Sequence, residues 1–279
     1  MDLLLEDLRV KQTVKKTKHG FQKVGNDVNL SGIEKLKFIS YNVWFEKHNF
    51  EERNIELRKI FLQFDPDFIC LQEVTQDFLQ LIFSDDQICD KYYFSSSSLV
   101  QAYDVLILSK YPIPFKCRYF PSEMGRNLLF GVITINDIDI SIGTTHLESI
   151  DYNDDYRLCQ LTAIEDQFKS YQESILMGDF NFAKKSEDQN IPEGYYDVWH
   201  ALHPNEEGHT MQASQQYPSI RFDRIILKQS ENWKPSHIEL IGRDPLPSYQ
   251  SKQFAPFEII TPSDHYGLYL ELSFIGKKS

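Results

Sequence analysis

The fold of this chain is decided by residues 174–182, SILMGDFNF, where an apolar run ends in two polar residues. A short apolar run without alternating polar residues predicts a β-strand that is buried on both faces. Asp179 and Asn181 contribute nothing to the packing of such a strand, because a buried polar side chain without a partner is costly. We therefore expect the end of this strand to carry a function.

Helices and strands alternate around this stretch. Leu158, Leu161, Ile164 and Phe168 recur at helical spacing and predict a helix that leads into it. The residues Asn136-Asp137 indicate a two-residue hairpin turn. Other helices are predicted at residues 49–64 and 75–83, and other strands at residues 35–45, 67–74, 103–109, 128–135, 138–146, 221–227 and 265–272.

This alternation of hairpins and helices favours a four-layer α/β sandwich, in which two packed mixed sheets are flanked by helices, over a doubly wound parallel sheet. The glycine-rich nucleotide-binding motifs GxGxxG and GxxxxGKS/T do not occur. Residues 36–279 are predicted to form a single domain after a flexible arm at residues 1–35, which mixes charged and polar residues without periodicity. Residues 183–219 and 242–262 are predicted to be surface loops that shape a site.

Composition limits the function classes. The 279 residues are 41% apolar, enough for one large core, and have a formal net charge of −12. That charge argues against a generally basic nucleic-acid-binding surface but not against a local basic groove. Four widely spaced cysteines without a CxxC pair argue against a disulfide framework and a zinc ribbon. With no secretory leader and no apolar run of about 20 residues, we expect an intracellular protein without a membrane span, in the nucleus or cytoplasm if the cell is eukaryotic.

Polar residues stand at six predicted strand ends. They are Asn42, Gln72, Glu73, His146, Asp179, Asn181, Asp223, Asp264 and His265. Each one alone has an ordinary alternative as a strand cap or a solvated side chain. If neighbouring strands end at one edge of a sandwich, these side chains converge, and clustered carboxylates are costly unless a cation or hydrogen bonds compensate them.

The donor types in this set indicate a hard metal ion. Carboxylate and amide oxygens without cysteine suit Mg²⁺ or Mn²⁺, which usually takes one or two carboxylates from the protein. Glu73 is the best candidate ligand. His146 and His265 lack the third close nitrogen or sulfur ligand of a zinc centre, so we expect them to stabilise charge.

Five motifs occur in a fixed order: YNVWF (41–45), LQEV (71–74), TTHLES (144–149), GDFNF (178–182) and SDHYGL (263–268). This ordered set resembles the endonuclease/exonuclease/phosphatase superfamily of Mg²⁺-dependent phosphoester hydrolases. MGRNLL (124–129), YYDVW (195–199), RFDRIIL (221–227) and IELIG (238–242) are similar to the 5′-tyrosyl-DNA phosphodiesterases of that superfamily. The resemblance implies a catalytic domain that cleaves the bond between a topoisomerase tyrosine and a 5′ DNA phosphate, and so repairs topoisomerase–DNA adducts.

The resemblance implies roles for four residues around the metal and the nucleophile. Glu73 matches the Mg²⁺ ligand, and Mn²⁺ is expected to substitute for Mg²⁺. Asp179 matches the residue that orients and deprotonates the attacking water, and Asn181 matches its partner. Asn42 matches a residue that lies close to both metal and phosphate.

A second group of matched residues contacts the phosphate. His265 matches the histidine at the scissile phosphate, and Asp223 is expected to hydrogen-bond to it. His146 and Ser149 match further phosphate contacts. Asp264, beside His265 in the sequence, is counted among the substrate-binding residues.

Two residues are expected beside the leaving group of the substrate. Tyr103 and Arg126 fall where the resembled family has an aromatic ring and an arginine beside the phosphotyrosyl group, and a cation over an aromatic face can stabilise phenolate charge. The alternative is an ordinary exposed tyrosine and a surface arginine. Trp44 is also counted as substrate-binding.

Single-stranded DNA requires aromatic and basic residues along a groove. Candidates are Trp44, Tyr195, Trp199 and the loop 203–222, although Trp199 fits the core equally well. Met211 stands at or near the place of a tryptophan in the resembled family. This departure loosens the inference about which base or leaving group stacks there.

The expected partners are DNA with a 5′-phosphotyrosyl end on a single-stranded or frayed terminus and a topoisomerase-derived peptide, bound by a monomer. One alternative keeps the fold and changes the substrate to abasic DNA, RNA tails, inositol phosphates or sphingomyelin. Another is a catalytically silent module that recognises phosphorylated partners. Intact Glu73, Asp179, Asn181 and His265 argue against the silent module.

Overall fold

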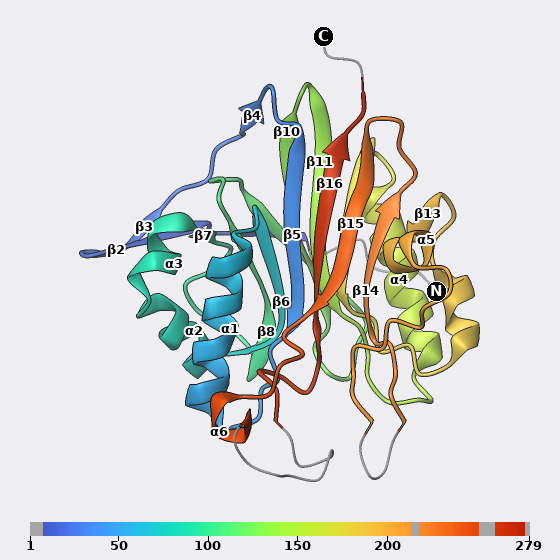
Figure 1. Cartoon of the computed structure of the whole chain (residues 1–279). Helices are drawn as coiled ribbons and strands as arrows, with labels where there is room; N and C mark the ends of the chain where they lie inside the picture. The colour runs from blue at the N-terminus through green and yellow to red at the C-terminus, as the bar shows by residue number, and fades with distance from the viewer. Residues whose placement is uncertain (1–7, 214–217, 251–259, 277–279) are drawn as a thin grey trace.

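The computed structural model describes residues 8–213, 218–250 and 260–276. Two eight-stranded sheets pack face to face, and helices cover their outer surfaces (Figure 1). The prediction of a four-layer α/β sandwich is therefore confirmed.

The first sheet has the strand order β1-β9-β10-β11-β12-β14-β13, and β4 pairs with β10 off this path. Its strands are β1 (Leu8–Lys11), β4 (Asn29–Leu30), β9 (Phe115–Tyr119), β10 (Asn127–Ile135), β11 (Ile138–His146), β12 (Glu173–Asp179), β13 (Tyr195–Asp197) and β14 (Asp223–Lys228). β10 and β11 form the hairpin predicted at Asn136-Asp137, whose φ angles of 53° and 62° suit a two-residue turn.

The second sheet has the order β15-β16-β5-β6-β8-β7-β2-β3. Its strands are β2 (Val14–Thr17), β3 (Gly20–Lys23), β5 (Lys35–Asn42), β6 (Phe68–Thr75), β7 (Tyr93–Phe94), β8 (Tyr103–Ser109), β15 (Trp233–Ile241) and β16 (Gly267–Phe274). Both sheets are mixed, because β5 pairs in parallel with β6 and β11 in parallel with β12 while their other neighbours are antiparallel.

Helices α1 (Phe50–Phe64), α2 (Gln76–Phe83) and α3 (Asp86–Lys91) cover the outer face of the second sheet, and α4 (Asp154–Phe168) covers the first (Figure 1). The connecting segments contain a short 3₁₀ helix (Lys185–Asn190), α5 (Val198–Leu202) and α6 (Pro247–Gln250). None of the helices in the described ranges is long and apolar enough to cross a membrane.

Buried apolar side chains fill the three spaces between the four layers. Phe38 and Met177 belong to the cluster between the two sheets. Leu57 and Phe61 of α1 pack on the second sheet. Burial of such side chains supplies the main driving force for folding, at about 25 cal/mol per Å² of apolar surface.

The two halves of the sandwich repeat one structural unit. In each, a strand leads through a loop into a helix of 15 residues and then into a parallel strand: β5–α1–β6 and β11–α4–β12. The first strands end at Asn42 and His146, and the second strands carry Glu73 and Asp179 at or near their ends. The parallel pairing brings the carboxyl end of each first strand beside that of its partner.

Three expectations need correction. The flexible arm predicted at residues 1–35 is wrong for residues 8–30, which contain β1 to β4 and pair with both sheets; residues 1–7 lie outside the described ranges. Part of the predicted loop at 183–219 forms the 3₁₀ helix, β13 and α5. Leu158 is 45% exposed, because α4 turns Arg157 toward the interior in its place.

Gly178 allows β12 to approach β11 just before Asp179. Its φ is +148°, and a Cβ built on it would lie 1.9 Å from the backbone oxygen of Thr145. A side chain at this position therefore meets backbone, which cannot move aside as a flexible side chain can.

We expect Gly178→Ala to destabilise the protein by roughly 2–4 kcal/mol, because backbone strain and a steric clash act together. Urea denaturation measures the change. Gly194→Ala is the matched control: its φ is +81°, but no atom lies within 4 Å of the added Cβ, so its cost is the conformational part alone, about 1 kcal/mol. Equal losses in the two variants would contradict the proposed clash.

Candidate active site

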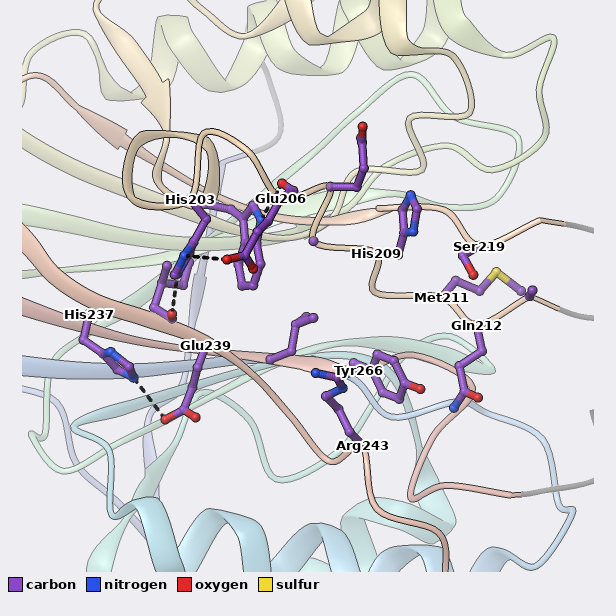
Figure 2. Close-up of a pocket in the computed structure, with 16 residues that line it drawn as sticks. His203, Glu206, His209, Met211, Gln212, Ser219, His237, Glu239, Arg243 and Tyr266 are labelled. Carbon is purple, nitrogen blue, oxygen red and sulfur yellow. Dashed lines mark hydrogen bonds and ion pairs between the residues drawn. The ribbon is translucent and has the colours of Figure 1, made fainter. Parts of the chain in front are cut away.

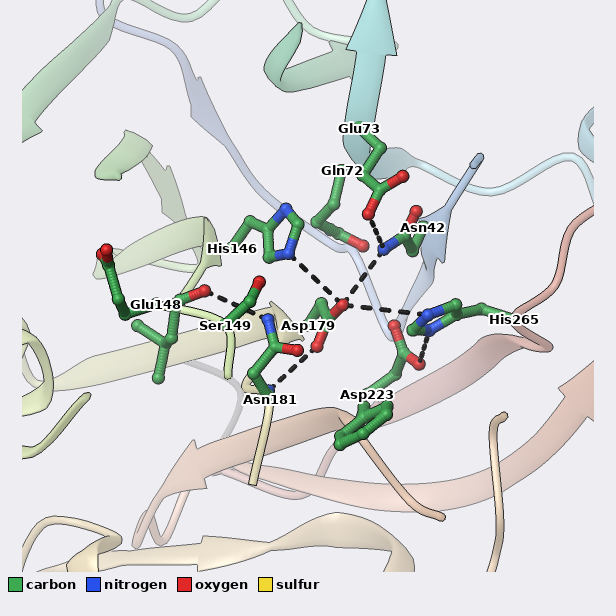
Figure 3. Close-up of polar contacts among 12 residues, drawn as sticks. Asn42, Gln72, Glu73, His146, Glu148, Ser149, Asp179, Asn181, Asp223 and His265 are labelled. Atoms are coloured by element: carbon green, nitrogen blue, oxygen red, sulfur yellow. Dashed lines mark hydrogen bonds and ion pairs between the residues drawn. The ribbon is translucent and has the colours of Figure 1, made fainter. Parts of the chain in front are cut away.

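Strand ends from both sheets meet in one buried polar cluster (Figure 3). Asn42, at the end of β5, donates from Nδ2 to Glu73 Oε1 at 3.1 Å and to Asp179 Oδ2 at 3.0 Å. Asp179 belongs to the first sheet, whereas Asn42 and Glu73 belong to the second. The Asn42 amide therefore joins the two sheets at the site, as the convergence of strand ends predicts.

Unusual backbone conformations aim two of these side chains. Glu73 lies where the pairing of β6 with β8 shifts by one residue between Leu71 and Val74, and its φ is 59°. Asn181 follows β12 with a φ of 51°. Bulges and positive φ angles in non-glycine residues are costly and occur often at functional sites, where they redirect a side chain. Here they turn Glu73 and Asn181 toward the cluster.

Asp179 is the centre of the cluster and is 2% exposed. Besides Asn42, the backbone N–H of Asn181 donates to Asp179 Oδ1 at 2.9 Å. Burial raises the pKa of Asp179 to about 7; the charges of Asp223 and Glu73 add to this effect, and His265 opposes it. Its carboxylate can therefore accept a proton near neutral pH.

The two histidines have opposite charge preferences. Burial lowers the pKa of His146 well below its ordinary value, and the charges of Arg126 and His265 act in the same direction. Burial also disfavours the charged form of His265, but Asp223, whose Oδ2 lies 2.7 Å from His265 Nδ1, outweighs it and raises the pKa of His265 well above its ordinary value. His146 is thus neutral and His265 cationic.

Both imidazoles approach the central carboxylate. His146 Nε2 lies 3.5 Å from Asp179 Oδ2, and His265 Nε2 lies 4.0 Å from the same atom. Arg126 Nη1 lies 2.9 Å from His146 Nδ1 and is a donor only. Nδ1 of the neutral ring is therefore the acceptor, so the proton of His146 is on Nε2 and points toward the cluster.

The donor set fits a divalent cation. Ligand atoms of Glu73, His146 and Asp179 lie within 4.8 Å of one another, as do those of Asp179, Asp223 and His265. Burial raises the pKa of Glu73, although the Phe45 N–H and Asn42 hydrogen-bond to its carboxylate. A buried carboxylate, Asp179, beside a half-buried one, Glu73, both with raised pKa in the protein alone, is the arrangement that a hard cation stabilises.

The residues predicted on the leaving-group side also lie together. Arg126 Nη2 donates to Ser149 Oγ at 2.8 Å, and its guanidinium carbon lies 5.6 Å from the centre of the Tyr103 ring. Arg126 is 4% exposed, so the alternative of a surface arginine is wrong. Phe45, which sequence reasoning missed, stacks on Tyr103 with ring centres 5.0 Å apart. Its place in YNVWF, three residues after Asn42, was the available signal.

The remaining candidates lie at the edge of the cluster or outside it. Asp264 is partly buried, and the charges of His265 and Arg53 act on it. Trp44 is half-buried with its ring over the guanidinium of Arg53.

Trp199 is 5% exposed in the core between the sheets, which confirms the core alternative. Tyr195 packs against the core under α4, so its assignment to a DNA groove is wrong.

A cavity of about 930 Å³ adjoins the site beyond His265 (Figure 2). Tyr266, the neighbour of His265, and Met211, which is bridged to His265, both line it. Its other polar lining residues include His203, Glu206, Glu207, His209, Gln212, His237, Glu239 and Arg243. The loop predicted at 203–222 therefore forms one wall of this cavity in its described part.

Comparisons with known proteins agree with the fold and the motifs. The model of the Endonuclease/Exonuclease/phosphatase family matches residues 39–265. The chain is similar to tyrosyl-DNA phosphodiesterase 2 of Danio rerio, with 27% identity over 256 residues, and of Mus musculus, with 24% identity over 259 residues. These alignments cover 84% and 86% of this chain, but 66% of each relative. The chain thus spans just under two thirds of the length of these relatives.

Solved structures show the same architecture. D. rerio TDP2 complexed with single strand DNA product is similar with a TM-score of 0.72 and 25% identity, covering 86% of this chain and 99% of that one. TDP2 from C. elegans is similar with a TM-score of 0.70 and 21% identity, covering 88% of this chain and 76% of that one. The latter likeness shows the fold alone.

In the metal-free protein, we expect His265 to stay protonated at pH values well above 6.5 and His146 to stay neutral well below 6.5. Because the folded pKa of His265 is raised, the stability that its pairing contributes is complete below the ordinary pKa and is lost as pH rises through the raised value. NMR titration of the imidazole nitrogens measures both. Asp223→Asn should move the His265 titration to lower pH, and a wild-type His265 that titrates below its ordinary range would refute the assignment.

Proposed function

Since the chain belongs to the endonuclease/exonuclease/phosphatase family, we propose that it is a Mg²⁺-dependent phosphodiesterase that hydrolyses the bond between a tyrosine and a 5′ DNA phosphate. The observation that carries the proposal is the adjacency of two groups of residues. A carboxylate cluster suited to metal and water lies beside an arginine and an aromatic pair suited to a phenolic leaving group.

The metal ligand in this proposal is Glu73, and Mn²⁺ can replace Mg²⁺. A divalent cation stabilises the charge that develops on the non-bridging phosphate oxygens during attack. Glu73 is held for this purpose by the Phe45 N–H at 3.0 Å on one oxygen and by Asn42 on the other. These two donors fix the orientation of the carboxylate.

Asp179 acts as the general base. In the metal-free protein burial raises its pKa to about 7, and a general base is most effective when its pKa lies near the working pH. Asn181 contributes its backbone N–H to one carboxylate oxygen, and its side chain donates to the carbonyl of Leu147 at 3.1 Å. The base is therefore held in one rotamer, which favours a single angle of attack.

The histidines provide donors to the phosphate. Cationic His265 and the Nε2–H of neutral His146 lie on either side of Asp179 in Figure 3. Donors placed where negative charge develops lower the barrier without reorganising during the reaction. Asp223 supports His265 by accepting from its Nδ1.

The leaving group is a phenolate in this proposal. Tyrosine has a pKa near 10, so its departure depends less on protonation than that of an alkoxide. The Arg126 guanidinium, fixed between His146 and Ser149, supplies positive charge on that side. Tyr103 and Phe45 supply aromatic surface for the tyrosine ring and for the peptide attached to it.

The DNA strand is proposed to enter the cavity beyond His265, on the other side of the phosphate from Arg126. D. rerio TDP2 is described with a single strand DNA product, and this supports a single-stranded or frayed 5′ end as the substrate. We further propose that the protein acts as an intracellular monomer, in the nucleus or cytoplasm if the cell is eukaryotic, on topoisomerase-derived adducts.

The decisive assay compares a 5′-phosphotyrosyl oligonucleotide, an abasic duplex and an inositol polyphosphate, each with Mg²⁺ or with EDTA. We expect Mg²⁺-dependent release of tyrosine from the first substrate at the highest rate. Asp179→Asn should lower this rate by a factor on the order of 10²–10⁴, because the general base is removed. Glu73→Ala should abolish Mg²⁺-dependent turnover.

Circular dichroism of both variants checks that the fold is intact. Full activity in either folded variant would end the catalytic assignment. A higher rate on the abasic duplex or the inositol polyphosphate would move the protein to another substrate class of the same family.

Phe45→Ala should raise KM for a 5′-phosphotyrosyl oligonucleotide by roughly 2- to 10-fold, the value of one aromatic contact of about 0.5–1.5 kcal/mol. Phe45→Tyr keeps the stacked ring and is the matched control, with KM close to that of the wild type. The same alanine variant should affect a substrate with a non-aromatic 5′ leaving group less, and an equal effect on both substrates would exclude aromatic recognition by Phe45.

A further inference from the structure

Two buried arginines occupy equivalent positions in the two repeated units. Arg53 is the fourth residue of α1 and Arg157 is the fourth residue of α4, and both helices have 15 residues. Both arginines are 0% exposed. Arginine is rarely buried to this extent unless its donors are satisfied, so each position requires an explanation that the catalytic groups themselves do not supply.

The Arg53 guanidinium is held by backbone carbonyls. Nε donates to His48 at 2.8 Å, Nη1 to Val43 at 3.1 Å and Pro262 at 3.4 Å, and Nη2 to Trp44 at 3.1 Å and Glu46 at 2.6 Å. The Trp44 ring covers the guanidinium at 4.3 Å. Within the described ranges, no carboxylate forms an ion pair with Arg53. The planar guanidinium thus holds the loop 43–48 in one conformation through its backbone carbonyls and does not pair with a single carboxylate.

The loop that Arg53 shapes supports the metal ligand. The N–H of Phe45 donates to Glu73 Oε2 at 3.0 Å, and the N–H of Trp44 donates to Asn42 Oδ1 at 3.0 Å. Trp44 has a φ of 60°, an unfavourable conformation that the contacts of its carbonyl with Arg53 help to maintain. Arg53 therefore acts on Glu73 and Asn42 through two backbone donors.

Arg53 also connects this loop to the histidine loop through Pro262. The next residue, Ser263, donates from Oγ to the carbonyl of Asn42 at 2.7 Å and accepts from the N–H of His265 at 3.2 Å. One side chain thus joins the segment before α1 to the segment that carries His265.

Arg157 does the same on the other half of the site. Its Nη1 donates to the carbonyls of Glu148 at 3.1 Å and Ile150 at 2.8 Å, which flank Ser149. Its Nε donates to Glu187 at 2.6 Å. Ile150 has a φ of 74°, so this loop, like the loop 43–48, contains a strained residue whose carbonyl is held by a buried arginine.

We propose that Arg53 and Arg157 are twin positioning residues, of which Arg53 presets the Glu73 carboxylate for the divalent cation and Arg157 presets Ser149 and Arg126 for the substrate. The role proposed for Arg53 rests on the proposed assignment of Glu73 as metal ligand, and the role proposed for Arg157 rests on the proposed substrate. Each arginine acts through a loop and touches neither the metal nor the phosphate. Because the two arginines support different residues, we expect substitution of Arg53 to affect cation binding and substitution of Arg157 to affect substrate binding.

The test uses the conservative variants Arg53→Lys and Arg157→Lys, each of which keeps the charge and loses the planar fork. Mn²⁺ binding is measured by calorimetry on the protein without substrate. We expect Arg53→Lys to weaken Mn²⁺ about 10-fold, the usual effect of removing a group that orients a metal ligand. Arg157→Lys should keep the Mn²⁺ affinity within about twofold of the wild type, because no more than one weak contact near the cation is lost.

The second measurement is binding of a 5′-phosphotyrosyl oligonucleotide in EDTA, followed by fluorescence anisotropy. In this measurement the larger effect is expected at Arg157. Arg157→Lys should weaken oligonucleotide binding about 5-fold, equivalent to the loss of one hydrogen bond between Ser149 and the substrate. Arg53→Lys should have little effect. Each variant is thus the control for the other. Equal losses of Mn²⁺ affinity in both variants, or none in Arg53→Lys, would overturn the proposal.

Thermal unfolding shows whether each variant folds. If Arg53→Lys does not fold, Trp44→Leu removes the aromatic cover of the guanidinium and should weaken Mn²⁺ about 3-fold, in line with a cation–π contact of 0.5–1 kcal/mol; unchanged Mn²⁺ affinity would then refute the role of Arg53. Mn²⁺ affinity requires no turnover, so a failure of the wild type to cleave phosphotyrosyl DNA would refute the proposed function without deciding the role of Arg53.

Discussion

The site depends on one buried carboxylate at the junction of the two sheets. Asp179 ends a strand of the first sheet, and Asn42, from the second sheet, donates to it at 3.0 Å. A buried ionised group must be hydrogen-bonded or paired, since its desolvation is otherwise prohibitive. The two sheets must therefore end at one edge and within hydrogen-bond distance of each other. Gln72 and Thr144, joined at 2.9 Å, form a second polar contact across the same junction.

The repeated strand–helix–strand unit explains why this edge carries the chemistry. In each unit the loop after the first strand is free of sheet pairing and can supply backbone donors or a hydroxyl, while the second strand supplies a rigidly held acid. One unit contributes Glu73 and the Phe45 N–H, and the other contributes Asp179 and Ser149. The two halves of the fold thus contribute different groups to one cluster.

The sequence predicted the parts of the fold that local pattern controls. Apolar runs and the Asn136-Asp137 turn located the central strands, and polar residues at strand ends located most of the cluster. Strands β1 to β4 were missed because they are short, largely exposed and polar, so their pairing depends on distant partners. Arg157 was missed because a buried arginine has no sequence signature, and the neighbouring Leu158 fitted an apolar stripe equally well.

The sequence pattern did not predict the charge states of the site residues, because these depend on tertiary structure. His146 and His265 are the same residue type beside the same aspartate, yet burial together with the charge of Arg126 lowers the pKa of the first, whereas Asp223 outweighs burial and raises the pKa of the second. The positive charge that acts on Asp179 comes from His265, whose Nε2 lies 4.0 Å away, while the His146 ring lies between Asp179 and Arg126. The sequence therefore identifies the residues at the strand ends, whereas the charge of each one depends on the neighbours that the fold places beside it.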